Sequence, residues 1–339
     1  AHHDPEAYQL YLRGSQVWQL RGKPNIQQGI VLLERAVELD PELAQAHAAL
    51  AITYALSPMH ELDPEIGPLH RSEQAAQRAA ELDPTLSQPH SALGLVAMTR
   101  RQWKDAELAY RRAISLNPND ALARYWLGEL FAISGRTRDA LDTMQETHQL
   151  DPISIPLNSD IANLHLRNDD FARGCPYIER AVSLMPEELQ ADPFTVLKQA
   201  RCREHAGDTA GMLAAERRAE RIFEYEQPLS RMVREAVQDP ALTARTVAAI
   251  QAETARGKVT LASHYRALGD NDTALALLER AMERNNYNAL RDVWESDARA
   301  MRQLPHFRAF VESIGLVDYW RATAWADTCR PQGDSFSCD

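Results

Sequence analysis

Residues 81–120 read ELDPTLSQPHSALGLVAMTRRQWKDAELAYRRAISLNPND, and this stretch decides the fold. It contains two similar tetrads, ELDP at 81–84 and SLNP at 115–118, whose prolines stand 34 residues apart. Pro152 and Pro186 continue the same spacing. A fixed period of this length indicates a repeat architecture in which each copy is one supersecondary unit.

Each tetrad has the composition of a helix end. A leucine precedes Asp, Asn or Met, and a proline follows, which lacks a backbone donor and keeps the preceding residue out of the helical region. Further copies are QLDP at 149–152 and SLMP at 183–186. An earlier copy, ELDP at 38–41, stands 43 residues before Pro84. The excess over 34 predicts a nine-residue insertion near residues 59–67.

Small residues recur with the same period. Small side chains let two helices approach closely, so these positions predict helix crossings. With the aromatic residues Phe131 and Tyr110, the pattern resembles the tetratricopeptide repeat family. This resemblance implies an all-α fold, a right-handed α-solenoid of stacked helix-turn-helix repeats. The small residues at equivalent positions are Gly94, Gly128 and Ala162; Ala106, Ala140 and Gly174; and Ala113, Thr147 and Ala181.

The resemblance also implies a domain organisation. Residues 1–325 are expected to form the superhelix, and residues 326–339 a disulfide-closed tail. Irregular helix pairs are expected at 7–43, with an insertion around Lys23, Pro24 and Asn25, and at 189–254. Capping helices are expected at 289–325. The clear repeats are 44–86, 87–120, 121–154, 155–188 and 255–288.

A tetratricopeptide stack presents the first helix of each pair along a concave surface that holds peptide segments. The resemblance therefore implies a peptide groove on these helices. Leu95 and Met98 have an alternative role, which is packing against the next turn of the superhelix. In the clearest pair of repeats the corresponding positions are Ser91, Leu95, Tyr125 and Glu129. None of them is Lys or Asn, so the family's clamp for a C-terminal carboxylate is not expected. The groove candidates are Ala48, Ile52, Ser91, Leu95, Met98, Tyr125, Glu129, Asn163 and Arg167.

The two ends of the chain carry a more particular resemblance. DPEAY at 4–8 and YLRG at 11–14, together with the tail that ends SFSCD, are similar to the extracytoplasmic tetratricopeptide domain of bacterial membrane-anchored regulators. Those regulators carry a winged-helix DNA-binding domain or a class III adenylate cyclase. The resemblance implies a periplasmic or otherwise extracytoplasmic domain for sensing or interaction. The alternative is a cytoplasmic adaptor for protein complex assembly.

Four cysteines bear on the compartment. Cys329 and Cys338 enclose eight residues, a loop that a disulfide closes easily, so we expect this pair to be oxidised. A metal site is not expected in the tail, since it offers two Cys and no His where about four ligands are needed. Cys175 and Cys202 lie on neighbouring predicted helices and could pair. Two small buried thiols are the other interpretation.

Composition narrows the class of partner. Lys and Arg total 37 against 48 Asp and Glu, giving a net charge of −11. Nucleic-acid binding needs a basic excess, so we expect a protein or peptide ligand that is neutral or basic. The longest uncharged apolar stretch, residues 48–56, is about half the ~18 residues of a membrane span. Membrane attachment is expected only through an N-terminal anchor outside this sequence.

No catalytic motif stands out. A nucleophile elbow and a phosphate-binding glycine loop are both missing from the sequence. His60, Glu61, Asp63, Glu65 and His70 could ligate a cation, but their spacing matches no known site and Pro64 interrupts any helix there. We expect a solvated loop in this insertion. The sequence therefore predicts a non-enzymatic protein without metal or cofactor.

Overall fold

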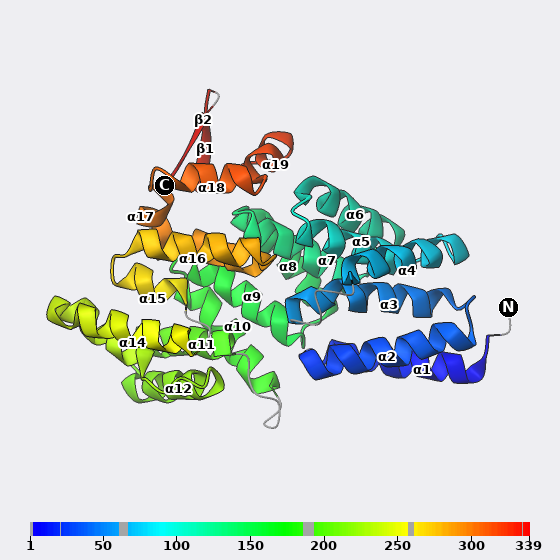
Figure 1. The fold of residues 1–339 in the computed structure, drawn as a ribbon, viewed down its shortest axis with the longest axis horizontal. Helices are drawn as coiled ribbons and strands as arrows, with labels where there is room; N and C mark the ends of the chain where they lie inside the picture. The colour runs from blue at the N-terminus through cyan, green and yellow to red at the C-terminus, as the bar shows by residue number, and fades with distance from the viewer. Residues whose placement is uncertain (1–2, 21, 61–66, 186–192, 257–260, 334) are drawn as a thin grey trace. The chain divides into compact units, whose positions relative to one another are not determined.

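The computed structural model describes residues 3–20, 22–60, 67–185, 193–256, 261–333 and 335–339 (Figure 1). The chain divides into two compact units. Unit 1 comprises residues 1–131, 284–287 and 314–324, and unit 2 comprises residues 132–283, 288–313 and 325–339. Each unit thus combines consecutive helix pairs with pieces of the C-terminal part of the chain.

Unit 1 consists of paired helices. α1 packs on α2, α3 on α4 and α5 on α6, while α3 also contacts α5 in the next pair. The short α19 packs against α6. The elements are α1 (Pro5–Gln19), α2 (Lys23–Leu39), α3 (Ala44–Leu56), the 3₁₀ turn η1 (Ser57–His60), α4 (Pro68–Leu82), α5 (Gln88–Thr99), α6 (Trp103–Leu116), most of α7 (Ala121–Ile133) and α19 (Leu316–Ala322).

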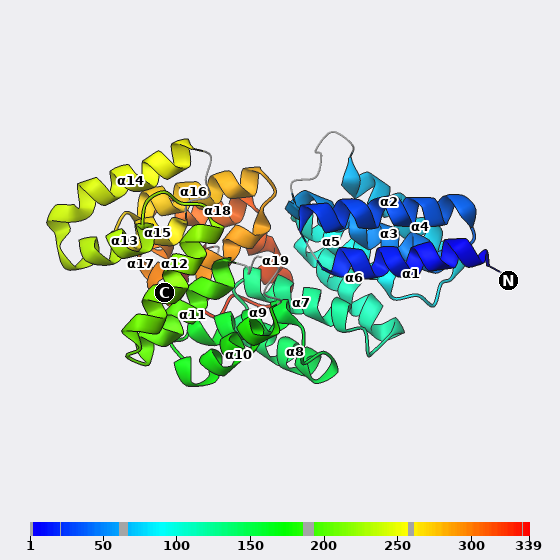
Figure 2. The ribbon, with the colours of Figure 1, turned by 90° about the horizontal axis from the view of Figure 1, so that it is seen from below.

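Unit 2 continues the pairing (Figure 2). α9 packs on α10, α11 on α12, α13 on α14 and α15 on α16. The all-α prediction of consecutive stacked helix pairs is confirmed. The elements are α8 (Thr137–Leu150), α9 (Ile155–Leu166), α10 (Phe171–Leu184), α11 (Pro193–His205), α12 (Thr209–Ile222), α13 (Leu229–Gln238), η3 (Pro240–Leu242), α14 (Thr243–Ala255), α15 (Ala262–Ala267), α16 (Asn271–Glu283), η4 (Tyr287–Trp294), η5 (Ser296–Ala298), α17 (Arg299–Arg302), α18 (Phe307–Ser313), β1 (Cys329–Gln332) and β2 (Ser335–Cys338).

The repeated tetrads end helices as their chemistry predicts. The second helix of each early pair stops at the tetrad leucine, and the next residue takes an extended backbone with φ between −134° and −143°. That residue precedes proline, which disfavours a helical conformation. Its side chain accepts a hydrogen bond from the N–H two residues later, as in an Asx turn. These pairs are Asp40 with Glu42, Asp83 with Thr85, and Asn117 with Asn119.

The small-residue positions mark close helix contacts. Gly94 of α5 faces Tyr110 of α6, whose ring is fully buried. A Cβ atom at Gly94 would clash with this ring and lie 2.7 Å from its Cδ1 atom. Glycine is therefore needed where these two helices cross.

Replacing Gly94 with alanine is expected to lower the free energy of unfolding by about 1–2 kcal/mol. Overpacking of a filled core costs about 1–3 kcal/mol, and the better helix propensity of alanine returns at most about 1 kcal/mol. Urea denaturation measures the change. The control is the same substitution beside Tyr110→Ala, where the cost should shrink because the ring is gone. A neutral or stabilising Gly94→Ala substitution in the unaltered chain would contradict this packing.

One local prediction differs from the structure, and a second lies mostly outside the residues that it describes. Lys23, Pro24 and Asn25 do not form an insertion but the first turn of α2. Proline is tolerated there, because the first helical N–H groups have no partner within the helix. In the predicted insertion at 59–67, η1 extends to His60 and α4 begins at Pro68. Glu61, Asp63 and Glu65 lie outside the described residues.

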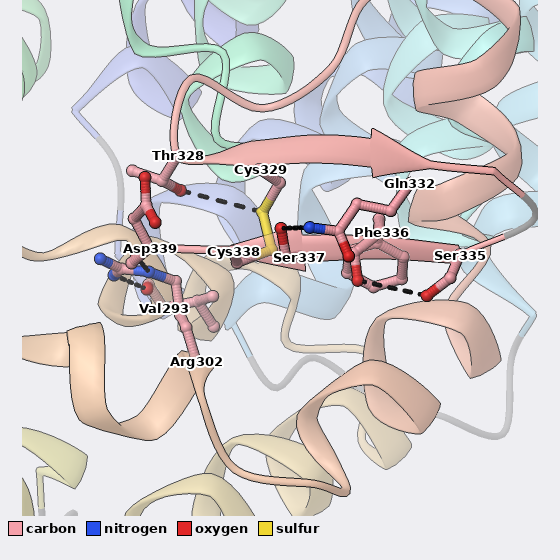
Figure 3. Close-up of a disulfide and its surroundings, with 10 residues drawn as sticks. All are labelled: Val293, Arg302, Thr328, Cys329, Gln332, Ser335, Phe336, Ser337, Cys338 and Asp339. Carbon is pink, nitrogen blue, oxygen red and sulfur yellow. Dashed lines mark hydrogen bonds between the residues drawn. A yellow bond between two sulfur atoms is a disulfide. The ribbon is translucent and has the colours of Figure 1, made fainter.

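The tail forms a β-hairpin, an element that the helical repeat did not predict. β1 and β2 pair antiparallel, with Cys329 opposite Cys338 and joined to it by a disulfide (Figure 3). Phe336 is buried, near Trp325 and under the guanidinium of Arg308. The hairpin is therefore held by packing as well as by its disulfide. Within the described ranges, no helix is both long and apolar enough to span a membrane.

Candidate functional site

The predicted groove residues lie on the first helices, as expected, but they are not open to solvent. Eight of the nine candidates expose at most 7% of their surface, and Tyr125 is half-buried. Their role in binding stays a prediction, and in this structure their side chains are covered. The eight buried candidates are Ala48 and Ile52 on α3; Ser91, Leu95 and Met98 on α5; Glu129 on α7; Asn163 on α9; and Arg167 directly after α9.

In unit 1 the buried candidates contribute to the core. Leu95 and Met98 are fully buried, so both side chains pack inside this unit. The Met98 sulfur lies 4.0 Å from the Tyr110 hydroxyl. Burial raises the pKa of Tyr110 well above its usual value, and Tyr287 and Glu129 add to this effect. Tyr287 therefore lies near Tyr110 of α6 within this unit.

A C-terminal segment also packs on α6 in unit 1. The indole N–H of Trp103 donates to the Ile314 carbonyl at 2.7 Å. The Tyr319 hydroxyl donates to the buried Glu107 carboxylate at 2.5 Å. Gly315 has φ +76°, and a Cβ there would lie 3.8 Å from the Trp103 indole nitrogen. The residues predicted to cap the stack are thus joined to an earlier repeat.

In unit 2 the two polar candidates hold a carboxylate. Glu295 Oε1 lies 3.4 Å from both Asn163 Nδ2 and Arg167 Nε. Its Oε2 lies 3.4 Å from Arg201 Nη1 of α11. Arg167 also donates to the Ala132 carbonyl at 3.1 Å. Donors from two successive helix pairs therefore converge on one side chain of the C-terminal segment.

Trp294, the residue before Glu295, packs on the turn between α7 and α8 in the same unit. The Trp294 indole N–H donates to the Ile133 carbonyl, at the end of α7, at 2.7 Å. Its ring covers Gly135, where an added Cβ would lie 2.9 Å from the ring and 2.7 Å from Ala326 Cβ. Gly135 has φ +79°, a conformation that favours glycine. The turn between α7 and α8 thus fits the flat face of an indole.

Arg302 holds the backbone of residues 293–295, which carries the Trp294 and Glu295 side chains. Its Nη1 donates to the Val293 carbonyl, and its Nε donates to the Asp339 carbonyl at 2.7 Å (Figure 3). The same Nη1 also donates to the Glu295 carbonyl. Burial lowers the pKa of Arg302 to about 10. The guanidinium remains charged at neutral pH and joins residues 293–295 to the end of the hairpin.

Further ion pairs flank the same segment. Arg291 pairs with Asp160 of α9 at 2.5 Å, and Arg266 of α15 pairs with Asp297 at 2.9 Å. Burial raises the pKa of Asp292, although the positive charge of Arg266 opposes this effect. Residues 291–297 are therefore held within unit 2 by ion pairs as well as by the buried side chains of Val293 and Trp294.

All four cysteines are paired. Besides the hairpin disulfide, Cys175 of α10 is bonded to Cys202 of α11, with Cα atoms 5.6 Å apart. The structure therefore has the paired form of Cys175 and Cys202 and not the two-thiol alternative. In the part of the chain that the structure describes, no group of three His, Cys, Asp or Glu side chains is placed to hold a metal ion.

Sequence reasoning missed the residues that complete the arrangement in unit 2. Trp294, Glu295, Arg201 and Arg302 belong to no repeat column, so periodicity could not select them. The available signal was the density of aromatic residues and arginines beyond the last repeat. Such a composition predicts that residues after the last repeat are packed against the protein, but it does not identify the helices that they contact.

Comparison with known proteins supports the fold. A family model described as tetratricopeptide repeat matches residues 91–152, which run from α5 to the end of α8. PilF of Pseudomonas aeruginosa is 17% identical over 68% of this chain and 98% of its own, with a TM-score of 0.51. A search of curated protein sequences gives no match.

Two other solved structures have lower scores. PilW, a type IV pilus biogenesis factor, is 13% identical over 67% of this chain and 98% of its own, with a TM-score of 0.48. A thermophilic tetratricopeptide protein of Thermus thermophilus is 17% identical over 58% of this chain and 98% of its own, with a TM-score of 0.46.

The repeat pattern and the family match define the class. Residues 91–152 are tetratricopeptide repeats, and the remaining helix pairs extend them into an all-α protein of stacked pairs. Repeats of this class are scaffolds for binding proteins or peptides, and they are generally non-enzymatic. The PilF similarity, at 17% identity, concerns the fold alone.

Proposed function

We propose that this chain is a non-enzymatic scaffold that binds protein or peptide segments in an extracytoplasmic compartment. The observation that carries the proposal is the pairing of all four cysteines within a chain of tetratricopeptide repeats. Disulfides form and persist in oxidising compartments and are rare in the cytosol. A protein-binding scaffold outside the cytoplasm accounts for both features.

Within that role we assign the chain to the interaction domain of a bacterial signalling or transcriptional regulator. This assignment rests on the resemblance of residues 4–14 and of the tail to such domains. The second candidate, a cytoplasmic adaptor, is favoured by the repeats but would keep the four cysteines reduced. The net charge of −11 favours neutral or basic partners over the whole surface.

Thiol trapping in the native host, on the full-length gene product, separates the two compartments. After an acid quench, a maleimide reagent is applied in denaturant at neutral pH, and peptide mapping locates the labelled residues. It is expected to label none of Cys175, Cys202, Cys329 and Cys338 before reduction and all four after it. In the variant Cys329→Ser/Cys338→Ser, reduction should add labels only at Cys175 and Cys202 among these positions. Four labels without reduction would contradict the extracytoplasmic assignment.

The binding role is tested in the same cells. A photo-crosslinking residue at Tyr125, which is half-buried on α7, is expected to give a defined protein adduct. The control position is Leu108, which is 57% exposed on α6. The absence of an adduct at Tyr125, or an identical adduct at both positions, would contradict binding along the first helices.

A further inference from the structure

Trp294 and Glu295 contact unit 2 in the manner of a bound peptide. Both side chains are buried, and each has its own set of partners on helices far away in sequence. The backbone carbonyls of 293 and 295 face Arg302 instead. A short segment held by two side-chain anchors and a fixed main chain presents the same kinds of contact as a bound peptide.

The carboxylate partners form a built site. Arg167 is almost completely buried, and its guanidinium is fixed by the Ala132 carbonyl at 3.1 Å. Asn163 is also buried and approaches the same carboxylate oxygen at 3.4 Å. A buried cation needs a paired anion, because its desolvation is costly without one. The site therefore requires a carboxylate whenever it is closed to water.

Arg201 gives this site a side that faces solvent. Its side chain is 39% exposed, and it lies 3.4 Å from Glu295 and 4.0 Å from the exposed Asp169. A carboxylate approaching from solution meets Arg201 first and Arg167 behind it. Arg201 also approaches the Leu166 carbonyl at 3.5 Å and lies over the Phe171 ring, so it is held in place beside the carboxylate.

The indole partners select the neighbouring residue. The Ile133 carbonyl is left without its intrahelical partner at the end of α7, and the Trp294 N–H satisfies it. Gly135 has no side chain, so the indole ring can lie directly against its backbone, where an added Cβ atom would clash with the ring. An aromatic residue with a ring N–H fits this position better than an aliphatic one.

We propose that Ile133, Gly135, Asn163, Arg167 and Arg201, here called the Trp-Glu site, recognise a partner peptide that carries tryptophan followed by glutamate. In the free chain Trp294 and Glu295 occupy the site as an internal ligand. A partner that presents the same pair displaces them. This inference rests on the proposed scaffold function and names the chemistry of its ligand.

The local charge of the site decides the kind of partner. The chain as a whole is acidic, which by itself disfavours an acidic ligand. At the Trp-Glu site, however, the groups within hydrogen-bonding distance of the carboxylate are two guanidiniums and an amide. Short-range contacts outweigh the mean charge, because exposed charges beyond about 8–10 Å are largely screened at physiological salt.

A peptide of residues 288–296, NALRDVWES, is the probe. With a fluorescent label it is titrated against the full chain and against the variant Trp294→Ala/Glu295→Ala, in which the site is vacant. The vacant variant is expected to bind the peptide at least tenfold more tightly than the unaltered chain. Replacing the glutamate of the peptide with glutamine, or its tryptophan with alanine, should weaken this binding at least tenfold.

Arginine substitutions test whether the peptide binds at the Trp-Glu site. Added to the vacant variant, Arg201→Gln is expected to weaken peptide binding at least tenfold. Arg203→Gln is the matched control, because Arg203 lies on the same helix and pairs with Glu179. If the vacant variant does not fold, as judged by circular dichroism, Glu295→Gln takes its place. In that variant the ring stays bound, and peptide binding should still exceed that of the unaltered chain.

Three results would overturn the proposal. One is a folded vacant variant that binds the peptide no better than the unaltered chain. Another is equal binding of the glutamate and glutamine peptides. The third is a dimer of the unaltered chain that Glu295→Gln abolishes, which would assign the site to a second copy. None of these results changes the thiol state in cells or the Tyr125 adduct, so the proposed function is judged separately.

Discussion

Replacing Trp103 with alanine is expected to lower the free energy of unfolding of unit 1 by about 3–5 kcal/mol. The side chain is almost fully buried at the start of α6, and its N–H satisfies the Ile314 carbonyl at 2.7 Å. The substitution leaves a large cavity and an unpaired carbonyl, and both destabilise the folded state. Urea denaturation measures the loss, and hydrogen exchange shows where protection falls.

Exchange should increase most at residues 314–322. These residues are joined to α6 through Trp103 and through the Tyr319–Glu107 hydrogen bond, so they lose one of two polar anchors. Trp103→Phe keeps most of the ring and loses only the donor, and about 1–3 kcal/mol is expected. Leu108→Ala, at an exposed position of the same helix, should change stability by less than about 0.5 kcal/mol. A Trp103→Ala variant that keeps full protection at 314–322 would refute the contact.

The helix ends were predictable because their cause is local. The leucine, the extended residue and the proline of each tetrad act on neighbouring backbone groups, so α2, α4, α6 and α8 stop where the sequence says. Gly94 is similar, since its column of small residues predicts a helix crossing, and Tyr110 of the next helix lies against it. The insertion expected around Lys23 is instead the first turn of α2, where proline is well tolerated.

The coverage of the first helices was not predictable in the same way. Glu295 contacts Asn163 across 132 residues, and Trp294 contacts Ile133 across 161 residues. Contacts of this range leave no period in the sequence, and the segment that makes them is too short and irregular to resemble a repeat. The groove candidates lie on or directly after the first helices of their pairs, and their binding role stays a prediction. The segment that covers Asn163 and Arg167 was predicted only as a cap.

The net charge of the chain is negative, whereas the groups around the Glu295 carboxylate are positive. This difference also arises from contacts between residues that are far apart in the sequence. A net charge of −11 describes the average field and predicts partners that approach the whole surface. The Trp-Glu site is defined instead by Arg167 and Arg201, which folding brings together from α9 and α11. Counting charges along the chain cannot reveal such a cluster. The chemistry of a binding site depends on which charges the fold places side by side.

Acidification is expected to destabilise unit 2 through His264 on α15. The imidazole is buried, and its Nδ1 has no hydrogen-bond partner among the described residues. Burial lowers the pKa of His264 from 6.5 to about 4. Between these values the unfolded chain binds a proton that the folded chain excludes, so stability falls as the pH falls. The loss attributable to this group reaches about 3 kcal/mol by pH 4, since one pKa unit is worth about 1.4 kcal/mol.

His264→Gln isolates this contribution from the other titrating groups. Glutamine keeps a polar side chain at the position and does not titrate, so the difference in unfolding free energy between the two proteins should vary with pH only through the histidine. That difference is expected to be constant above pH 7 and to shift by about 3 kcal/mol toward the variant between pH 6.5 and pH 4. Urea denaturation at half-unit pH steps measures it. Curves that run parallel through this range would mean that the imidazole is protonated in the folded chain, and then it must have solvent or an anionic partner near Nδ1.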